Sequence, residues 1–206
     1  MANVDNTKQL VRIRLCGNKP LIFNVDDVKR LRCDLRIVGS LVGSLPRFPQ
    51  QNSFYGLPVL LLPEEATFVL QNGWGTLSDN DTTGEKDKTW VNEKSIKYQV
   101  YRYLWQQGLY ITSGEKFGGD YLAYPGDPMR FHSHYIISVQ QDGQTWSLMD
   151  LVAMGRLATN TKKTFVLAGS TTQDVENTDQ DRNNNSKTTL EDEAQITCFS
   201  ITWAGF

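Results

Sequence analysis

Cysteine and histidine are scarce in this chain of 206 residues, which has three cysteines and two histidines. The cysteines, at positions 16, 33 and 198, are odd in number and far apart, which argues against a disulfide framework and favours a reducing compartment. No C-x-x-C pair or Cys/His cluster is present, so a structural zinc site is not expected. The start of the chain has no apolar segment of the signal-peptide type, and we expect no secretory signal.

Long hydrophobic runs are also missing from the sequence. The longest strongly apolar run, residues 57–62, is too short for a membrane-spanning helix and includes Pro58. Hydrophobic residues nevertheless make up 39% of the chain and aromatic residues 11%, which is enough to build a packed core. We therefore expect a folded protein without a membrane partner.

The chain has no large excess of charge of either sign, and its formal net charge is −2 at pH 7. The charge is uneven, however: residues 1–63 hold nine basic and four acidic residues, whereas residues 164–206 hold two and seven. A protein that coats nucleic acid without specificity is usually basic overall. If this chain handles nucleic acid, we expect it to use a local site or partner subunits.

Sequence motifs for several reaction classes are absent. The chain has no G-x-S-x-G motif, P-loop or dinucleotide-binding glycine pattern, so acyl hydrolysis, nucleotide hydrolysis and hydride transfer have no support. Residues 79–90 partly match a calcium-binding loop, but Trp90 stands where a bidentate glutamate is needed. The acidic pairs of the chain lie in polar stretches that are typical of solvated loops. We expect no metal ion and no cofactor.

The pattern along the chain indicates an α+β protein with two domains and a polar connection. Residues 78–94 are polar and charged, which is typical of a linker. This segment separates an amino-terminal domain, residues 1–77, from a second domain, residues 95–206. Each domain combines predicted helices with predicted strands, so each is expected to be a small mixed α/β unit.

Turn and capping residues mark the elements expected in the first domain. A Gly-Asn pair between alternating segments predicts a hairpin over residues 10–24. Acidic residues open a short helix over residues 26–35, and a Pro-Glu-Glu start with a glycine stop predicts a second helix over residues 63–73. Residues 39–58, rich in Gly, Ser and Pro, are expected to form an ordered loop.

The second domain is expected to begin with an amphipathic helix from Ile96 to Gly108. The other predicted elements are strands at 109–112, 117–124 and 135–140, a helix at 148–159, a buried strand at 163–167 and a terminal strand at 195–204. A long acidic loop is predicted at residues 169–194.

Residues 117–135, FGGDYLAYPGDPMRFHSHY, have the most unusual composition of the chain. Both histidines, His132 and His134, lie in this segment. The YPGDP block predicts a rigid turn, because its prolines fix φ and Gly126 permits tight curvature. Such a turn can aim a tyrosine and a histidine at one point, although these residue types near turns are more often ordinary structural residues.

Two sequences, GGDYLAYPGDPMRFHSHYI and DLVAMGRLATNTKKTFVLAG, resemble the catalytic domain of the tRNA-splicing endonuclease family. The earlier sequence IVGSLVGSLPRFPQQNSFYGLPVLLLPEEATFVL is also similar to that family, in particular to its eukaryotic catalytic subunit that cuts the 3′ splice site. The resemblance covers roughly residues 22–75 and 95–206. It implies an amino-terminal α/β domain followed by a mixed α/β nuclease domain of the tRNA-intron endonuclease type.

The resemblance also implies a catalytic set of one tyrosine, one histidine and one lysine. Matched residue by residue to the family's motifs, these are Tyr124 in YPGDP, His132 in FHSHY and Lys163 in KKTFVLA. The family pattern favours His132 over His134. Alternation along a strand would put both histidines on one face, so periodicity does not separate them.

The chemistry that the resemblance implies is metal-free RNA cleavage, in which the 2′-hydroxyl of the RNA attacks the adjacent phosphate. Tyr124 would remove the 2′-proton, His132 would protonate the departing 5′-oxygen, and Lys163 would stabilise the charged transition state. The products would carry a 2′,3′-cyclic phosphate and a 5′-hydroxyl. Acid or base assistance of this kind is worth about 10²–10⁴ in rate for each group. Because a free phenol is almost fully protonated at neutral pH, the tyrosine can instead serve to position the 2′-hydroxyl.

The resemblance further implies a nuclear heterotetramer that acts on precursor tRNA, with a second catalytic subunit and two structural subunits as partners. The apolar terminal strand suits edge-to-edge pairing with another subunit. Two other functions stay open at this point. One is a non-catalytic structural subunit of the same complex, against which the complete Tyr/His/Lys set argues. The other is a stand-alone RNA-binding module, against which the net charge of −2 argues.

Overall fold

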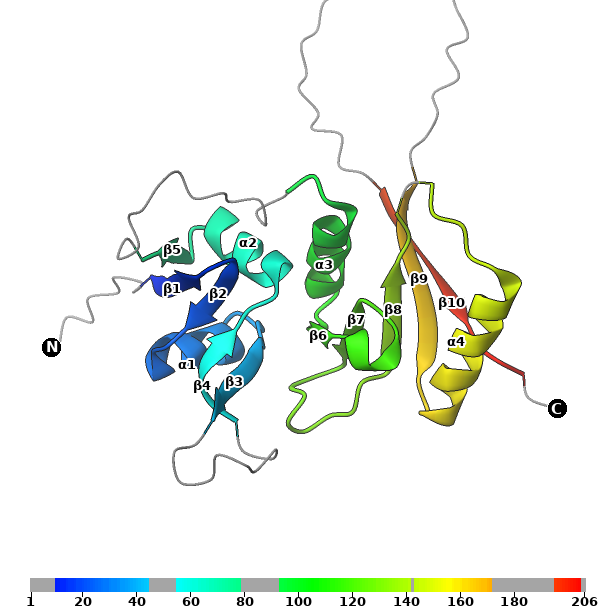
Figure 1. Cartoon of the computed structure of the whole chain (residues 1–206), viewed down its shortest axis with the longest axis horizontal. Helices are drawn as coiled ribbons and strands as arrows, with labels where there is room; N and C mark the ends of the chain where they lie inside the picture. Colours follow the sequence, from blue (N-terminus) through cyan, green and yellow to red (C-terminus); the bar gives the residue numbers. More distant parts are fainter. Residues whose placement is uncertain (1–9, 45–54, 79–92, 142, 172–194, 205–206) are drawn as a thin grey trace, which may run out of the picture.

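Two mixed β-sheets, one in each half of the chain, form the framework of the protein (Figure 1). The structure is a computed structural model that describes residues 10–44, 55–78, 93–141, 143–171 and 195–204. Both halves combine helices with strands, so the α+β class predicted from the sequence is confirmed.

The first sheet has the strand order β3-β4-β2-β1-β5, in which only the β1–β5 pair is parallel. Its strands are β1 (Val11–Cys16), β2 (Lys19–Ile22), β3 (Ser40–Ser44), β4 (Tyr55–Leu60) and β5 (Gly75–Leu77). In β1 every second residue is buried, as expected for a strand with one face on the core. The predicted hairpin is confirmed by β1 and β2, which pair across a turn where Gly17 has a φ of 61°.

Two helices cover this sheet, and side chains at their first turns fix where they begin. In α1 (Val25–Cys33) the side chain of Asn24 accepts a hydrogen bond from the Asp26 N–H at 2.8 Å. In α2 (Pro63–Gln71) the Glu65 carboxylate accepts one from the Leu62 N–H at 2.8 Å. Both predicted helices are therefore confirmed.

The prediction of a loop over residues 39–58 is wrong, because β3 and β4 lie at its two ends. These strands approach each other closely at Gly43, where a Cβ atom would lie 1.8 Å from the carbonyl oxygen of Leu57. The pairing of β3 with β4 requires glycine at position 43. In the sequence alone, however, a glycine argues against a strand. Residues 45–54 lie outside the described part of the chain.

The second sheet has the strand order β10-β9-β8-β7-β6, in which only the β8–β9 pair is parallel. Its strands are β6 (Tyr110–Ser113), β7 (Tyr121–Tyr124), β8 (Tyr135–Val139), β9 (Thr164–Thr171) and β10 (Gln195–Ile201). Helix α3 (Ile96–Gln106) precedes the sheet, and α4 (Leu148–Asn160) connects β8 to β9. A helical crossover of this kind is what a parallel neighbour requires.

The elements predicted in the second half are confirmed, with three corrections at their ends. Of the predicted strand at 117–124 only residues 121–124 form a strand, β7, because Phe117 ends a short 3-10 turn, η1 (Glu115–Phe117). Strand β9 runs to Thr171, beyond the predicted strand end, and only residues 172–194 of the acidic segment lie outside the described chain. The two histidines precede β8 and are not part of a strand.

The calcium-like segment 79–90, in the connection between the two halves, also lies outside the described residues.

Helix α3 lies between the two sheets and joins the halves into one core (Figure 1). Its Trp105 indole N–H donates a hydrogen bond to the Leu35 carbonyl at 2.8 Å, and the Arg36 guanidinium lies 4.5 Å from the centre of the indole ring. Ile37 forms a parallel β-bridge with Ile111 of β6. The segment after α1 is therefore attached directly to the second half.

Rings from both halves pack around α3. Phe68 of α2 lies 4.8 Å from Trp105 and 6.1 Å from Tyr101, measured between ring centroids. On the far face of the second sheet, α4 covers a smaller core that includes Ile136 and Phe165. The second sheet is thus enclosed between α3 and α4. In the described part of the chain, no helix has the length and apolar character that crossing a membrane requires.

Candidate active site

Strand pairing brings three segments that are distant in sequence to one edge of the second sheet. Ala123 of β7 pairs with Tyr135 of β8, which pairs in turn with Thr164 of β9. One position further along, His134 lies between Tyr124 and Lys163. The His134 N–H donates to the Ala123 carbonyl at 2.9 Å, and the His134 carbonyl accepts from the Thr164 N–H at 2.9 Å.

This row of residues belongs to the face of the sheet that α4 covers. Leu122, Ile136 and Phe165 form the core under α4, and Tyr124 packs against it. Because side chains alternate along a strand, positions 124, 134 and 163 share that face with them. Tyr124 and Lys163 stand two strand spacings apart, which is about 10 Å between their Cα atoms. The tyrosine and the lysine predicted as catalytic are thus brought to one edge.

His132 lies two residues before His134, in the segment that leads into this edge. Both histidine side chains are exposed, while Ser133 between them is buried. The alternation predicted for the pair is therefore present, although the segment that carries both histidines is not part of a strand. His134 is held through its backbone by β7 and β9, whereas His132 belongs to the loop between β7 and β8.

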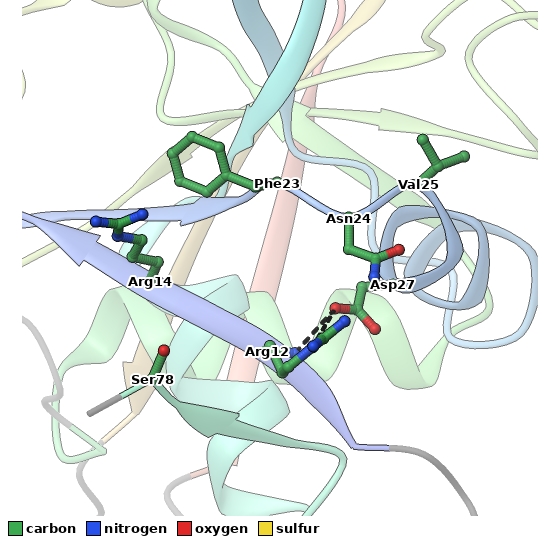
Figure 2. A pocket seen from close by; sticks show the side chains of 7 residues that line it. All are labelled: Arg12, Arg14, Phe23, Asn24, Val25, Asp27 and Ser78. Atoms are coloured by element: carbon green, nitrogen blue, oxygen red, sulfur yellow. Dashed lines mark hydrogen bonds and ion pairs between the residues drawn. The ribbon is translucent and has the colours of Figure 1, made fainter. Parts of the chain in front are cut away.

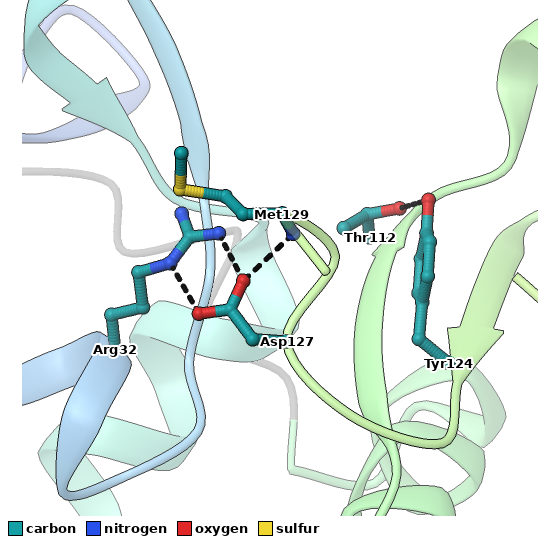
Figure 3. A network of polar contacts seen from close by, with 5 residues as sticks. All are labelled: Arg32, Thr112, Tyr124, Asp127 and Met129. Atoms are coloured by element: carbon teal, nitrogen blue, oxygen red, sulfur yellow. Dashed lines mark hydrogen bonds and ion pairs between the residues drawn. The ribbon is translucent and has the colours of Figure 1, made fainter. Parts of the chain in front are cut away.

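Tyr124 is half-buried at the end of β7, and a neighbour on β6 contacts its hydroxyl group. Its hydroxyl oxygen accepts a hydrogen bond from the Thr112 hydroxyl at 3.3 Å (Figure 3). The phenol oxygen of Tyr124 is therefore the acceptor in this contact. The contact also fixes the direction in which the phenol points. Thr112 carries no signal in the sequence that would mark this role.

Lys163 is presented by the tight connection between α4 and β9. Its backbone N–H donates to the Ala158 carbonyl at 2.8 Å, and its ammonium group donates to the Thr161 carbonyl at 3.1 Å. The ammonium nitrogen also lies 5.3 Å from the centre of the Phe117 ring. No sequence pattern connects Phe117 with Lys163, because the two are 46 residues apart.

The loop between Tyr124 and His132 is organised around Asp127 (Figure 3). The carboxylate of Asp127 accepts hydrogen bonds from the Arg32 side chain at 3.0 Å and 2.6 Å, and from the Met129 N–H at 2.8 Å. The hydrogen bond from Arg32 is the main reason that the pKa of Asp127 is lowered to about 2. This carboxylate therefore stays ionised throughout the physiological range.

The rigid turn predicted for YPGDP has a packing basis as well. At Gly126 a Cβ atom would lie 2.6 Å from the ring of Phe131, so the ring rests directly on the glycine backbone. The N–H groups of Arg130 and Phe131 donate to the Asp127 carbonyl at 2.8 Å and 3.0 Å. Sequence reasoning found the glycine and the prolines but missed Arg32, which comes from the other half of the chain.

The described residues contain no group of three or more His, Cys, Asp or Glu side chains that could hold a metal ion. The functional groups at this edge are a phenol, an imidazole and an ammonium group. Together they can move protons and stabilise negative charge on a phosphate.

A cavity of about 510 Å³ lies elsewhere, at the start of α1 (Figure 2). Its walls include Arg14 and Phe23, with the guanidinium carbon 5.7 Å from the ring centre. Arg12 and Asp27 form an ion pair there at 3.5 Å. None of the predicted catalytic residues lines this cavity.

Two family models match the chain, one in each half. Residues 11–80 match the TSEN34-like N-terminal domain, and residues 95–177 match the tRNA intron endonuclease catalytic C-terminal domain. Together these matches cover most of the chain and include all three sequences that carry the resemblance.

Individual proteins are similar to the chain over different lengths. It is 26% identical to the probable tRNA-splicing endonuclease subunit sen34 of Schizosaccharomyces pombe, over 91% of this chain and 95% of the relative. It is 50% identical to the tRNA-splicing endonuclease subunit Sen34 of Homo sapiens, over 35% of this chain and 23% of the relative. It is 33% identical to the tRNA-splicing endonuclease subunit SEN34 of Saccharomyces cerevisiae, over 55% of this chain and 35% of the relative. The match thus spans nearly the whole fission yeast protein but less than a quarter of the human one.

Proposed function

Since the chain belongs to the tRNA-splicing endonuclease family and carries its catalytic domain, we propose that it is the subunit that cleaves precursor tRNA at the 3′ splice site. The alternative of a non-catalytic structural subunit is not favoured, because the second half of the chain matches the catalytic-domain model.

The observation that carries this proposal is the strand register at the edge under α4. It puts Tyr124 and Lys163 on either side of His134 and on one face, with His132 in the adjoining loop. A cleaved phosphodiester needs one group near the 2′-oxygen, one near the departing 5′-oxygen and a cation near the phosphate. A phenol, an imidazole and an ammonium group around one edge meet that need.

In the proposed reaction the 2′-hydroxyl attacks the adjacent phosphorus, and the bond from phosphorus to the 5′-oxygen breaks. Tyr124, reacting as its phenolate, takes the proton of the 2′-hydroxyl as the attack proceeds, and Thr112 holds the phenol oxygen in place. His132 gives a proton to the departing oxygen, and Lys163 stabilises the negative charge on the phosphate. The products carry a 2′,3′-cyclic phosphate and a 5′-hydroxyl, and no metal ion takes part.

The assembly that we propose is a heterotetramer with a second catalytic subunit and two structural subunits. Strand β10 is the outermost strand of its sheet, and the side chains of Cys198 and Phe199 on it are exposed. An exposed apolar edge strand is a template for pairing with another chain. We also propose a nuclear location; the three exposed free cysteines suit a reducing compartment of that kind.

The proposal is tested by end-group analysis of precursor tRNA cut by the reconstituted complex. With His132→Ala or Lys163→Ala, we expect cleavage at the 3′ splice site to fall by at least 10²-fold while cleavage at the 5′ splice site and assembly persist. His134→Ala is the matched control and should retain 3′ cleavage. Unchanged 3′ cleavage in the His132 variant, with loss in the His134 variant, would transfer the acid role to His134.

A second arm of this experiment concerns metal ions. Cleavage should continue in excess EDTA, and its products should end in a cyclic phosphate. Activity that EDTA abolishes and magnesium restores would refute the proposed chemistry.

A further inference from the structure

The ion pair between Arg32 and Asp127 attaches the loop between β7 and β8 to the amino-terminal half of the chain (Figure 3). We infer that Arg32, acting through Asp127, is a positioning residue for RNA cleavage, because it fixes the loop that carries His132. This inference rests on the proposed function, in which His132 is the acid.

The geometry of the pair is that of a two-point anchor. The Arg32 Nε atom donates to one carboxylate oxygen of Asp127 at 3.0 Å, and an Nη atom donates to the other at 2.6 Å. A bidentate pair of this kind fixes orientation as well as distance, which a single contact does not do. The Arg32 side chain is 23% exposed and that of Asp127 is 32% exposed, so the pair is partly shielded from water.

The position of Arg32 is itself fixed by the core of the protein. This arginine lies in the last turn of α1, next to Leu31, which is buried in the shared core. The chain then continues directly to Leu35 and Ile37, which contact Trp105 and Ile111 of the second half. Among the interactions of the described residues that join the two halves, the pair with Asp127 is the hydrogen-bonded contact that reaches the β7–β8 loop.

Hydrogen bonds to Asp127 also hold the backbone as far as Phe131, the residue before His132. The carboxylate accepts the Met129 N–H, and the carbonyl accepts the N–H groups of Arg130 and Phe131. The Phe131 ring rests on Gly126, which closes the turn on itself. The three backbone N–H groups between Asp127 and His132 are therefore all hydrogen-bonded to Asp127.

On the other side of His132 the chain is held by the sheet. Ser133 is buried, and the His134 N–H donates to the Ala123 carbonyl at 2.9 Å. His132 is consequently an exposed residue between two fixed points, one in the sheet and one at Asp127. Loss of Arg32 removes the anchor at Asp127 but leaves the sheet side intact.

The kinetic test uses the reconstituted complex and an intron-containing precursor tRNA under single-turnover conditions. Arg32→Ala should lower the rate of 3′ cleavage at saturating enzyme by about tenfold or more. The enzyme concentration that gives half of the maximal rate should change less than about twofold, since the loop need not move to bind RNA. Arg32→Lys should recover part of that loss, because it keeps one charged contact. The matched control is Arg12→Ala, which removes an arginine–aspartate pair that lies within the amino-terminal half.

A second measurement does not depend on activity. Amide hydrogen exchange in the full chain should speed up at least tenfold at Met129, Arg130 and Phe131 in Arg32→Ala, with α3 unchanged as a check on folding. The Arg12→Ala control should leave those amides as they are. Should Arg32→Ala fail to fold, Arg32→Lys is measured in its place and is expected to show a smaller increase.

The two measurements distinguish a failure of the proposed function from a failure of the positioning role of Arg32. If the wild-type complex does not cleave RNA while exchange responds as expected, the proposed function is refuted and the anchoring role stands. If exchange at these amides is unchanged in Arg32→Ala, or if cleavage falls equally in Arg12→Ala, the positioning role of Arg32 is refuted.

Discussion

The His134 carbonyl accepts a hydrogen bond from the Thr164 N–H at 2.9 Å, and this contact joins the histidine segment to the strand that follows Lys163. Because β8 and β9 are parallel, both enter the sheet from the same edge, and their first residues lie side by side. The lysine reaches this edge only through the α4 crossover. The candidate active site is therefore a property of the sheet topology as much as of the loop that carries His132.

The hydroxyl of Tyr124 can be removed without disturbing the packing of its ring. Tyr124→Phe keeps the ring on the core under α4 and loses only the oxygen that Thr112 contacts. We expect 3′ cleavage to fall by about 10²–10⁴ with no more than a small change in thermal stability. Single-turnover cleavage and a melting curve on the same preparation measure both. Retention of most of the activity would show that the phenol oxygen has no part in the chemistry.

The Phe117 ring beside Lys163 can be tested with a substitution that keeps an apolar side chain. Phe117→Leu removes the face over which the ammonium lies 5.3 Å from the ring centre, and the backbone contact of Lys163 with Thr161 remains. An exposed cation–π contact is worth about 0.5–1 kcal/mol, so we expect cleavage to slow by about twofold to fivefold. Combined with Lys163→Ala, the same change should add nothing further. An additional loss in the double variant would mean that Phe117 acts independently of the lysine.

Gly126 should tolerate no side chain. In Gly126→Ala the new Cβ atom would lie 2.6 Å from the Phe131 ring, so the ring or the turn must shift. We expect at least a tenfold loss of 3′ cleavage, measured in the assembled complex.

The matched control for this change is Gly155→Ala in α4, where the nearest atom to the new Cβ is 3.8 Å away. Alanine in a helix is favoured over glycine by roughly 0.5–1 kcal/mol, so this variant should be slightly more stable and fully active. Equal activity of the two alanine variants would contradict the importance that we give to the turn.

Glu65 should make the stability of the fold depend on pH. Its carboxyl group is fully buried and is bonded by the N–H groups of Gly39 and Leu62, and burial raises its pKa from 4.5 to about 7. The folded state thus holds the proton to higher pH than the unfolded chain does. The stability that this group contributes is complete below pH 4.5 and is lost as the pH rises through 7, by about 3 kcal/mol in the free energy of unfolding.

Urea unfolding at pH 5, 6 and 7.5 measures that dependence. The comparison is with Glu65→Gln, which cannot ionise and should show a flatter profile. The glutamine variant is expected to lose about 1 kcal/mol at pH 5, because its amide cannot accept both N–H groups as well as a carboxyl does. If the free energy of unfolding changes with pH equally in both proteins, groups other than Glu65 cause the pH dependence.

The sequence predicted most of the helices because their signals are local. Pro63 with two acids at the start of α2, and the apolar face of α3, are features that neighbouring residues supply. Strands β3 and β4 were not predicted, because their pairing depends on Gly43 passing the Leu57 carbonyl, which only the folded chain brings together. The positions of Tyr124 and Lys163 were predicted by family resemblance, and their common edge follows from the strand register.

The supporting residues of the candidate site could not have been found in the same way. Arg32 and Asp127 are 95 residues apart, and nothing around Arg32 distinguishes it from the other basic residues of α1. The Thr112–Tyr124 contact likewise depends on the pairing of β6 with β7. Local patterns specify elements and turns, whereas contacts between distant elements depend on the packing that the whole chain achieves.

The ring contacts around α3 restrict how the two halves can be exchanged between related proteins. Phe68 and Trp74 come from the first half, and each lies within 6 Å of Trp105 in the second. A chimera that joined the first half of one relative to the nuclease half of another would place aromatic rings from two different proteins in contact. These rings have not been selected to pack against each other. Such hybrids should therefore need matched replacements on both sides of α3 before they accumulate as soluble, assembled protein.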